Sequence, residues 1–434
     1  MNIKNTYFFW VLRPWNKDFY KTYQNRLFLK SKLFLIGFFI SIFLIACKTN
    51  SQQPNKELAI KLTDTVALQI GASQLDKYIK FLKGKRVAVV GNQTSLIHTL
   101  PNEKYTHLVD TLLALNIHVK KVFSPEHGFR GKADAGEKVD DRIDQKTGLP
   151  IISLYGSNKK PKPNQLKGID LILFDLQDVG VRFYTYISTL HYVMEAAAEA
   201  KIPVIVLDRP NPNAHYVDGP ILEEKHRSFV GMHRIPIVYG MTIGEYAKMI
   251  NGEGWLRNGM QCNLTVIPIK NYTHQLAYNL PIKPSPNLPN AKAVNLYPSL
   301  CFFEGTSISC GRGTPTQFQI FGSPELPIDY YPFSFTPVPN EGAKHPKHQD
   351  KTCNGLDLSN TSDLSTINLQ WILDSYEKYP NKDTFFNPFF TKLAGTEKLQ
   401  EQIELGYSQK DIKKTWQPDL EKFKIIRSKY LLYD

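Results

Sequence analysis

The chain has 434 residues, enough for two domains, and carries 53 Lys and Arg residues against 40 Asp and Glu residues, a formal net charge of +13 at neutral pH. A positive balance of this size does not require a nucleic-acid partner, and the sequence contains no zinc-finger, RRM or basic-stripe pattern. We therefore expect no binding of nucleic acid.

The first 46 residues predict a signal peptide rather than part of the fold. A basic segment, residues 1–32, precedes an apolar run that ends in L-I-A-C at Cys47, the lipobox pattern in which the cysteine is acylated and becomes the new N-terminus. A membrane-spanning anchor is the alternative, although the run, about 14 residues, is short for a span. We expect a lipoprotein of the cell envelope, on the periplasmic side, anchored to the membrane at Cys47 and followed by a polar tether over residues 47–69.

Removal of the predicted signal peptide changes the net charge of the chain and leaves four cysteines after Cys47. Seven basic residues and one acid leave with the basic segment, so the net charge falls by six, from +13 to +7. This excess suits a domain near anionic envelope polymers. Cys262, Cys301, Cys310 and Cys353 remain, and their spacing matches no zinc motif. In an exported protein they either form a disulfide or stay as isolated buried thiols.

Short apolar runs alternate with amphipathic stretches from about residue 70 to residue 285. Strands are predicted at 86–92, 119–125, 149–155, 169–175 and 203–208, and helices at 73–82, 106–115 and 187–201. A further helix is marked by the capping box of Thr242 and Glu245. Continuous Val, Ile and Leu runs that alternate with helices predict a parallel sheet covered on both faces, in an α/β, Rossmann-like, doubly wound domain.

Polar residues follow each predicted strand, where open α/β sheets bind their ligands. The residues at these strand ends are Asn92, Glu126, His127, Tyr155, Asp175, Asp178, Asp208 and Arg209. We expect them to form one site. The first strand is followed by V-G-N-Q-T-S and not by G-x-G-x-x-G, so a dinucleotide cofactor is not expected. The sequence also lacks a Walker A motif, a G-x-S-x-G elbow and an H-E-x-x-H motif.

The segment Phe123–Glu137 is the most informative of these strand ends. It places Glu126 beside His127, followed by Arg130, Asp134 and Glu137, on a loop with several glycines that allow sharp turns. The alternative is a surface loop with ordinary solvated charges.

The composition changes after about residue 280. P-I-K-P-S-P-N-L-P-N predicts an extended connection, and residues 286–434 predict a smaller α+β domain. Glu304 and Arg312 in this part either close over the site or form a buried ion pair between the domains.

Two kinds of chemistry fit these residues. In glycoside hydrolysis Glu126 is the general acid, His127 or a nearby acid tunes it, and Asp178, Asp175 or Glu137 is the second carboxylate. Sugar recognition needs forked hydrogen-bonders and aromatic faces, and these are offered by Arg182, Tyr184, Tyr186, Asp208, Arg209, Asn211 and Asn213. A metal-dependent hydrolase would use Glu126, His127, Asp175 and Asp208, but no second histidine stands at ligand spacing from His127. An exported sugar-binding protein without turnover is the third possibility.

Several long motifs resemble one family, the NamZ-type exo-β-N-acetylmuramidases. They include S-P-E-H-G-F-R-G-K-A-D-A-G-E (124–137), F-D-L-Q-D-V-G-V-R-F-Y-T-Y-I-S-T-L (174–190), L-D-R-P-N-P-N (207–213) and L-Y-P-S-L-C-F-F-E-G-T (296–306). The resemblance runs from about residue 70 almost to the C-terminus. Ala214, Arg234 and Tyr239 depart from the usual pattern, and Tyr239 replaces a frequent histidine.

The resemblance implies a Rossmann-like domain, a smaller C-terminal domain and a site in the cleft between them. It also implies release of N-acetylmuramic acid from the non-reducing end of peptide-free peptidoglycan fragments, with no cofactor or metal. Glu126 falls on the family's acidic position. The lactyl carboxylate of the sugar would explain arginines such as Arg130, Arg182 or Arg209.

Overall fold

A computed structural model describes residues 67–99, 104–129 and 142–434, all of which belong to one compact unit, Val66–Asp434. The predicted signal peptide, Cys47, Arg130, Asp134 and Glu137 lie outside the described residues. No helix in the described part is long and apolar enough to cross a membrane.

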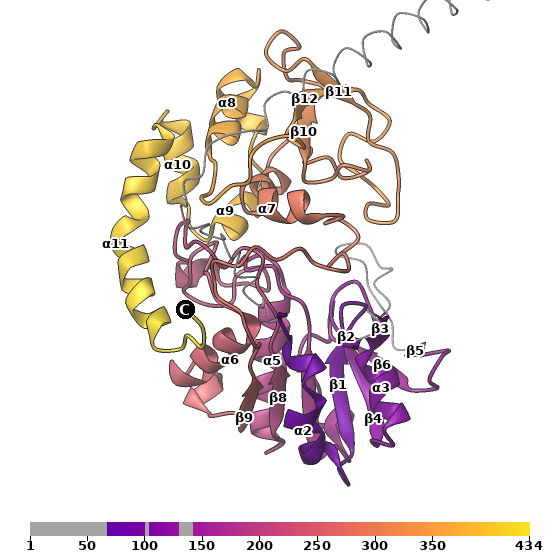
Figure 1. The fold of residues 1–434 in the computed structure, drawn as a ribbon. Helices are drawn as coiled ribbons and strands as arrows, with labels where there is room; N and C mark the ends of the chain where they lie inside the picture. The colour runs from indigo at the N-terminus through magenta and orange to yellow at the C-terminus, as the bar shows by residue number, and fades with distance from the viewer. Residues whose placement is uncertain (1–66, 100–103, 130–141) are drawn as a thin grey trace, which may run out of the picture. The chain divides into compact units, whose positions relative to one another are not determined.

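A seven-stranded sheet forms the centre of the fold (Figure 1). Its strands are β1 (Val87–Gly91), β4 (Val119–Ser124), β5 (Arg142–Ile143), β6 (Pro150–Ser153), β7 (Leu171–Asp175), β8 (Val204–Leu207) and β9 (Leu264–Ile267). They lie in the order β5-β6-β4-β1-β7-β8-β9, and every pair is parallel except β5 with β6. Without β5, this is the 3-2-1-4-5-6 order of the Rossmann fold.

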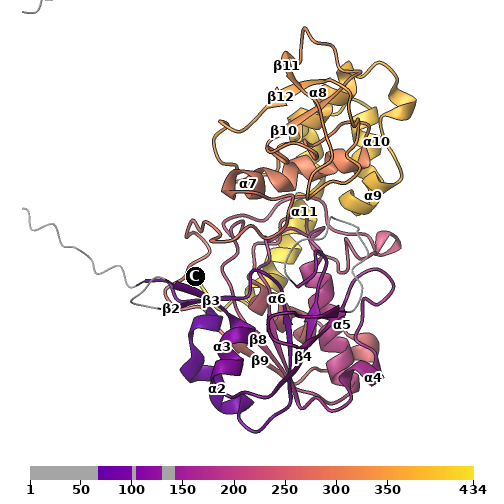
Figure 2. The ribbon, with the colours of Figure 1, turned by 90° about the vertical axis from the view of Figure 1, so that its right-hand side faces the viewer.

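Helices cover both faces of the sheet (Figure 2), and alternate residues of β1 belong to the cores on opposite faces. Val87 and Val89 of β1 pack with residues of α2 (Leu75–Leu82) and α3 (Leu108–Ala114), whereas Ala88 and Val90 pack with residues of α5 (Tyr186–Glu199) and α6 (Ile243–Gly252). A strand buried on both faces needs apolar residues at every position, which explains the continuous apolar runs. The predicted doubly wound α/β fold is confirmed.

The five predicted strands are present, and four further strands in this part of the chain were not predicted. β9 and β5 lie at the two edges of the sheet, and a hairpin of β2 (Leu96–Thr99) and β3 (Lys104–His107) follows β1. The capping box at the start of α6 is confirmed: Thr242 Oγ1 accepts from the Glu245 N–H at 3.2 Å, and Glu245 Oε2 accepts from the Thr242 N–H at 2.9 Å. A short helix, α4 (Pro163–Leu166), precedes β7.

The C-terminal part has a small antiparallel sheet and a set of helices. The sheet has the order β10-β12-β11, from β10 (Ile320–Ser323), β11 (Phe333–Phe335) and β12 (Cys353–Asp357). The helices are α7 (Ala291–Leu300), α8 (Gln370–Lys378), α9 (Phe389–Ala394), α10 (Lys398–Glu404) and α11 (Gln409–Ser428). The four cysteines are all buried and free, so the alternative of isolated thiols is the one that the structure adopts.

Candidate active site

The turn after β4 presents Glu126 and His127. It closes with a hydrogen bond from the Gly128 N–H to the Pro125 carbonyl at 3.1 Å, and His127 and Gly128 both have positive φ angles, 71° and 74°. A non-glycine residue in this region of backbone space is uncommon and is found disproportionately at functional sites. The side chains of Glu126 and His127 are largely buried, with 8% and 5% of their surfaces exposed.

Thr185 orients the carboxyl group of Glu126. Its Oγ1 donates to Glu126 Oε2 at 2.7 Å, and Thr185 is the N-cap residue of α5. The Glu126 carboxyl group therefore lies at the N-terminal end of a 14-residue helix, where the helix dipole favours negative charge.

Glu126 lines two adjoining cavities between the sheet and the C-terminal part. The larger has a volume of about 410 Å³, within the range of sites that enclose a small ligand. Its main lining residues are Glu126, Tyr155, Lys159, Thr185, Phe229, Tyr297, Glu304, Arg312 and Phe389. The smaller, of about 50 Å³, shares Glu126, Thr185 and Arg312 and adds His127, Tyr184, Tyr186, Ser285 and Asn287. Seven predicted site residues thus border the same space.

Glu304 and Arg312 line the cavity and pair with each other, but both belong to the C-terminal part and are partly exposed, so they are not a buried ion pair between the domains. Arg312 Nε lies 2.5 Å from Glu304 Oε1, and both residues line the larger cavity. Burial is the largest single influence and lowers the pKa of Arg312, but the interactions with Glu304 and with the neighbouring Cys310, Tyr297 and Cys301 together raise this pKa above its ordinary value. The pair is therefore an ion pair that also forms a wall of the site.

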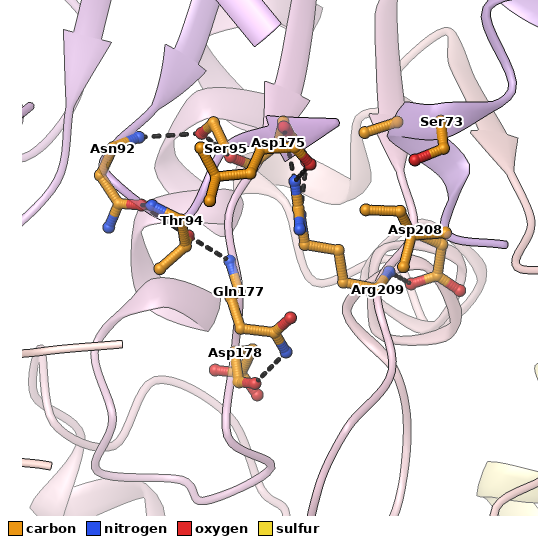
Figure 3. A network of polar contacts seen from close by, with 12 residues as sticks. Ser73, Asn92, Thr94, Ser95, Asp175, Gln177, Asp178, Asp208 and Arg209 are labelled. Carbon is orange, nitrogen blue, oxygen red and sulfur yellow. Dashed lines mark hydrogen bonds and ion pairs between the residues drawn. The ribbon is translucent and has the colours of Figure 1, made fainter. Parts of the chain in front are cut away.

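Another group of predicted site residues lies in an interior network instead (Figure 3). Arg209 reaches Asp175 with two hydrogen bonds, Nε to Oδ1 at 2.6 Å and Nη2 to Oδ2 at 2.9 Å, and both side chains are buried. Ser95 Oγ donates to the Asp175 carbonyl at 2.6 Å and accepts from the Asn92 N–H at 3.0 Å. The crevice between β1 and β7, where this fold commonly binds ligands, is thus filled by the chain's own side chains.

The loop after β8 is likewise fixed by hydrogen bonds between its own buried side chains and the rest of the protein. Asp208 accepts hydrogen bonds from Thr242 Oγ1 at 2.8 Å and from the Gly244 N–H at 2.7 Å, and burial raises its pKa to about 7. Asn211 Nδ2 donates to the Met241 carbonyl, and Asn213 Nδ2 donates to the Val179 carbonyl, both at 2.9 Å. None of these three side chains lines either cavity that contains Glu126.

Arg182 requires a correction. Its side chain is fully buried and donates to the main-chain carbonyls of Pro220, Ile235, Leu393 and Ala394 at 2.6–3.0 Å. Burial lowers its pKa to about 9. The predicted contact with a ligand carboxylate is wrong for this arginine, because its guanidinium holds the loops before β9 against α9.

Asp178, predicted to be catalytic, lies outside the two cavities. Its Oδ2 accepts from the Gly180 N–H at 2.7 Å and from the hydroxyl group of Tyr239. Burial raises the pKa of Asp178 to about 6, although the Tyr239 hydroxyl opposes this. Tyr239, the departure from the family pattern, is itself fully buried and contacts this carboxyl group rather than the cavities.

The four residues of the metal-dependent alternative do not converge. Asp175 and Asp208 lie in the interior network, whereas Glu126 and His127 line the cavities. Within residues 67–99, 104–129 and 142–434, no group of three or more His, Cys, Asp or Glu residues is arranged to hold a metal ion. A larger hollow, of about 720 Å³ near the C-terminus, contains none of the predicted site residues.

The sequence analysis missed Lys159, Thr185, Phe229 and Tyr297. Thr185 stands in the N-cap position before a strong helix and Phe229 lies in S-F-V-G-M-H, so both were within reach of motif reasoning. Tyr297 lies in the motif L-Y-P-S-L-C-F-F-E-G-T (296–306) and was also within reach, whereas Lys159 carried no comparable signal.

Comparisons with known proteins identify the family. The family description "Exo-beta-N-acetylmuramidase NamZ" matches in two parts, the N-terminal one over residues 87–292 and the C-terminal one over residues 295–433. The peptidoglycan beta-N-acetylmuramidase NamZ of Bacillus subtilis is 39% identical over 385 residues, which cover 83% of this chain and 89% of that protein.

Two crystal structures of DUF1343 family proteins from Bacteroides fragilis are also similar. One is 48% identical with a TM-score of 0.78, and the other is 29% identical with a TM-score of 0.73. Each comparison covers 85% of this chain and 99% of the other. The chain belongs to the NamZ exo-β-N-acetylmuramidase family.

Proposed function

We propose that the protein is an exo-acting glycoside hydrolase that releases N-acetylmuramic acid from the non-reducing ends of peptide-free peptidoglycan fragments. The observation that carries this proposal is the position of Glu126, a largely buried carboxyl group on the wall of a cavity of about 410 Å³ that is also lined by Tyr155, Phe229 and Tyr297. Aromatic walls suit the apolar faces of a sugar ring, and a carboxyl group among them suits proton transfer to a glycosidic oxygen.

We assign roles to three polar residues of the cavity, Glu126, Thr185 and Glu304. Glu126 gives its proton to the glycosidic oxygen as the bond to the anomeric carbon breaks, and water supplies the hydroxyl group that replaces the leaving sugar. Thr185 donates to Oε2 of Glu126 and so fixes the carboxyl group on the wall of the cavity. Glu304, paired with Arg312, is the other carboxylate of this cavity among the described residues and is the candidate for stabilising positive charge at the anomeric carbon.

Turnover of a chromogenic β-N-acetylmuraminide, compared with the matching N-acetylglucosaminide, tests the proposal. We expect the wild type to release the chromophore from the muraminide, and Glu126→Gln to lower kcat by about 10²–10⁴-fold with little change in KM. Glu199→Gln, at the far end of α5, is the matched control and should keep full activity. Failure of the wild type to cleave the muraminide, or faster cleavage of the glucosaminide, would overturn the substrate assignment. Full activity of Glu126→Gln would overturn its role as the acid.

We also propose that the protein is exported and tethered to the envelope membrane by acylation of Cys47. The support is the L-I-A-C pattern after a basic segment and an apolar run too short to span a bilayer comfortably. Growth with labelled palmitate should label the wild type and not Cys47→Ala. Equal labelling of both proteins, or none of either, would contradict this assignment.

A further inference from the structure

Lys159 is a cation on the wall of the catalytic cavity that is open to a ligand. It lies in the loop after β6, lines the same cavity as Glu126, and is partly exposed. Its Nζ lies 4.7 Å from the centroid of the Phe229 ring, and within the described part of the chain no carboxylate forms an ion pair with it. Its neighbour Lys160 differs, because Nζ of Lys160 is 2.7 Å from both Glu195 and Glu199.

Three arginines that the structure describes near the strand ends and the cavity already have partners within the protein. Arg209 is bonded to Asp175, Arg182 is bonded to four main-chain carbonyls, and Arg312 is paired with Glu304. An anion that entered the cavity beside Arg312 would also meet the negative charge of Glu304. Beside Lys159 it would meet a positive charge that no carboxylate of the described residues neutralises through an ion pair.

The Phe229 ring holds the ammonium group in place. Phe229 is supported by Tyr192, which stacks on it with an angle of 16° between the rings and a centroid distance of 6.3 Å, and by Tyr155 at 6.0 Å. A cation held over an aromatic face loses less side-chain freedom when it binds an anion than a solvated lysine does. Lys159 is therefore prepared for a carboxylate in the cavity.

We propose that Lys159 binds the lactyl carboxylate of the substrate and thereby selects muramyl over glucosaminyl residues, an inference that rests on the proposed function. Muramic acid differs from glucosamine by a lactyl ether that ends in a carboxylate. In peptide-bearing peptidoglycan this carboxyl group forms an amide and has no charge. The same contact therefore favours peptide-free substrates.

The test compares Lys159→Gln with Lys160→Gln on three chromogenic substrates. These are the β-N-acetylmuraminide with a free lactyl carboxylate, the same compound with that carboxyl group converted to a methylamide, and the N-acetylglucosaminide. Because Lys159 is partly exposed and solvent screens the contact, we expect kcat/KM for the free acid to fall about tenfold in Lys159→Gln. The values for the amide and the glucosaminide should not change. Lys160→Gln, which removes a charge outside the cavity, should keep the wild-type ratio of acid to amide.

Two further measurements distinguish loss of the Lys159 charge from misfolding of the variant. Lys159→Arg should retain the preference for the acid, and the thermal midpoint of each variant reports whether it is folded. A folded Lys159→Gln that keeps the wild-type ratio of acid to amide, or that loses activity equally on all three substrates, would overturn the inference. If the wild type cleaves none of them, the proposed function fails instead. Calorimetric binding of N-acetylmuramic acid and its methylamide to wild type and Lys159→Gln then decides the role of Lys159 separately.

Discussion

Replacement of Asp178 with asparagine should remove part of the pH dependence of folding stability. Asp178 is 3% exposed, and its Oδ2 accepts two hydrogen bonds, from the Gly180 N–H and the Tyr239 hydroxyl group. Its Oδ1 is buried and has no hydrogen-bond partner within the described residues. Burial therefore dominates and raises the pKa from the ordinary 3.8 to about 6.

The sign and size of the effect follow from these two pKa values. Between pH 3.8 and about 6 the folded protein keeps the Asp178 proton, whereas the unfolded chain has lost it. The free energy of unfolding therefore decreases as the pH rises through this window, and the loss is complete above about pH 6. A tenfold difference in proton affinity corresponds to about 1.4 kcal/mol, so the full loss is about 3 kcal/mol.

Asparagine cannot ionise, and its Oδ1 can accept the same two hydrogen bonds. Its amide group adds a buried donor that costs about 1–3 kcal/mol if unsatisfied, but this cost does not depend on pH. The difference in unfolding free energy, Asp178→Asn minus wild type, should therefore increase by about 2–3 kcal/mol between pH 4.0 and pH 7.5. Asp208, whose pKa burial raises to about 7, contributes equally to both proteins and cancels.

Urea unfolding of both proteins at pH 4.0, 5.0, 6.0 and 7.5 measures this difference, provided that the m-values agree. A difference that is the same at every pH would refute the reasoning, because Asp178 would then titrate alike in the folded and unfolded chains. The same variant tests the predicted catalytic role. A large loss of kcat in a stably folded Asp178→Asn would support that role, whereas unchanged kcat would make Asp178 part of the scaffold.

Two further predictions separate positioning from scaffolding. Thr185→Val removes the hydroxyl donor to Glu126 Oε2 and should lower kcat about tenfold with KM unchanged. Thr185→Ser should restore kcat. A higher KM with kcat unchanged would contradict the positioning role. Arg182→Met removes the donor to four buried carbonyls and should lower the free energy of unfolding by about 3–5 kcal/mol in urea, while KM of the remaining folded protein stays the same. Weaker substrate binding at unchanged stability would instead indicate that Arg182 contacts the substrate.

The central strands could be predicted because burial on both faces leaves a strong signal. All five residues of β1 and of β7 are buried, and both strands appear in the sequence as continuous apolar runs. The edge strands carry no such signal, since only the last of the four residues of β9 is buried and both residues of β5 are exposed. Edge strands are paired on one side only, so their sequences resemble loops.

The site was harder to predict because a sequence shows which residues follow a strand but not which of them bind each other. Asp175 and Arg209 are 34 positions apart in the sequence, and they bind each other. Their side chains, which we expected to contact a ligand at two strand ends, are therefore already paired. Glu126 and Tyr155 follow β4 and β6, which are neighbours in the sheet, and both line the cavity. The ends of β4 and β6 therefore contribute to the site together with the start of α5, which follows β7, and Lys159 lies on the loop after β6.

The predicted sugar-binding tyrosines fix, through hydrogen bonds, the proline-rich segment that borders the smaller cavity. The hydroxyl groups of Tyr184 and Tyr186 donate to the Pro284 carbonyl at 2.9 and 3.3 Å, and Gln93 Nε2 donates to the same carbonyl at 3.1 Å. Pro284 belongs to the proline-rich connection that leads to Ser285 and Asn287 in the smaller cavity. Since Thr185 lies between the two tyrosines, one short segment both orients Glu126 and fixes the chain that covers it. Replacing either tyrosine would disturb this wall of the cavity and, through its neighbour Thr185, the acid as well. Thr185→Val keeps both tyrosine hydroxyl groups and therefore tests the orientation of Glu126 separately from the wall.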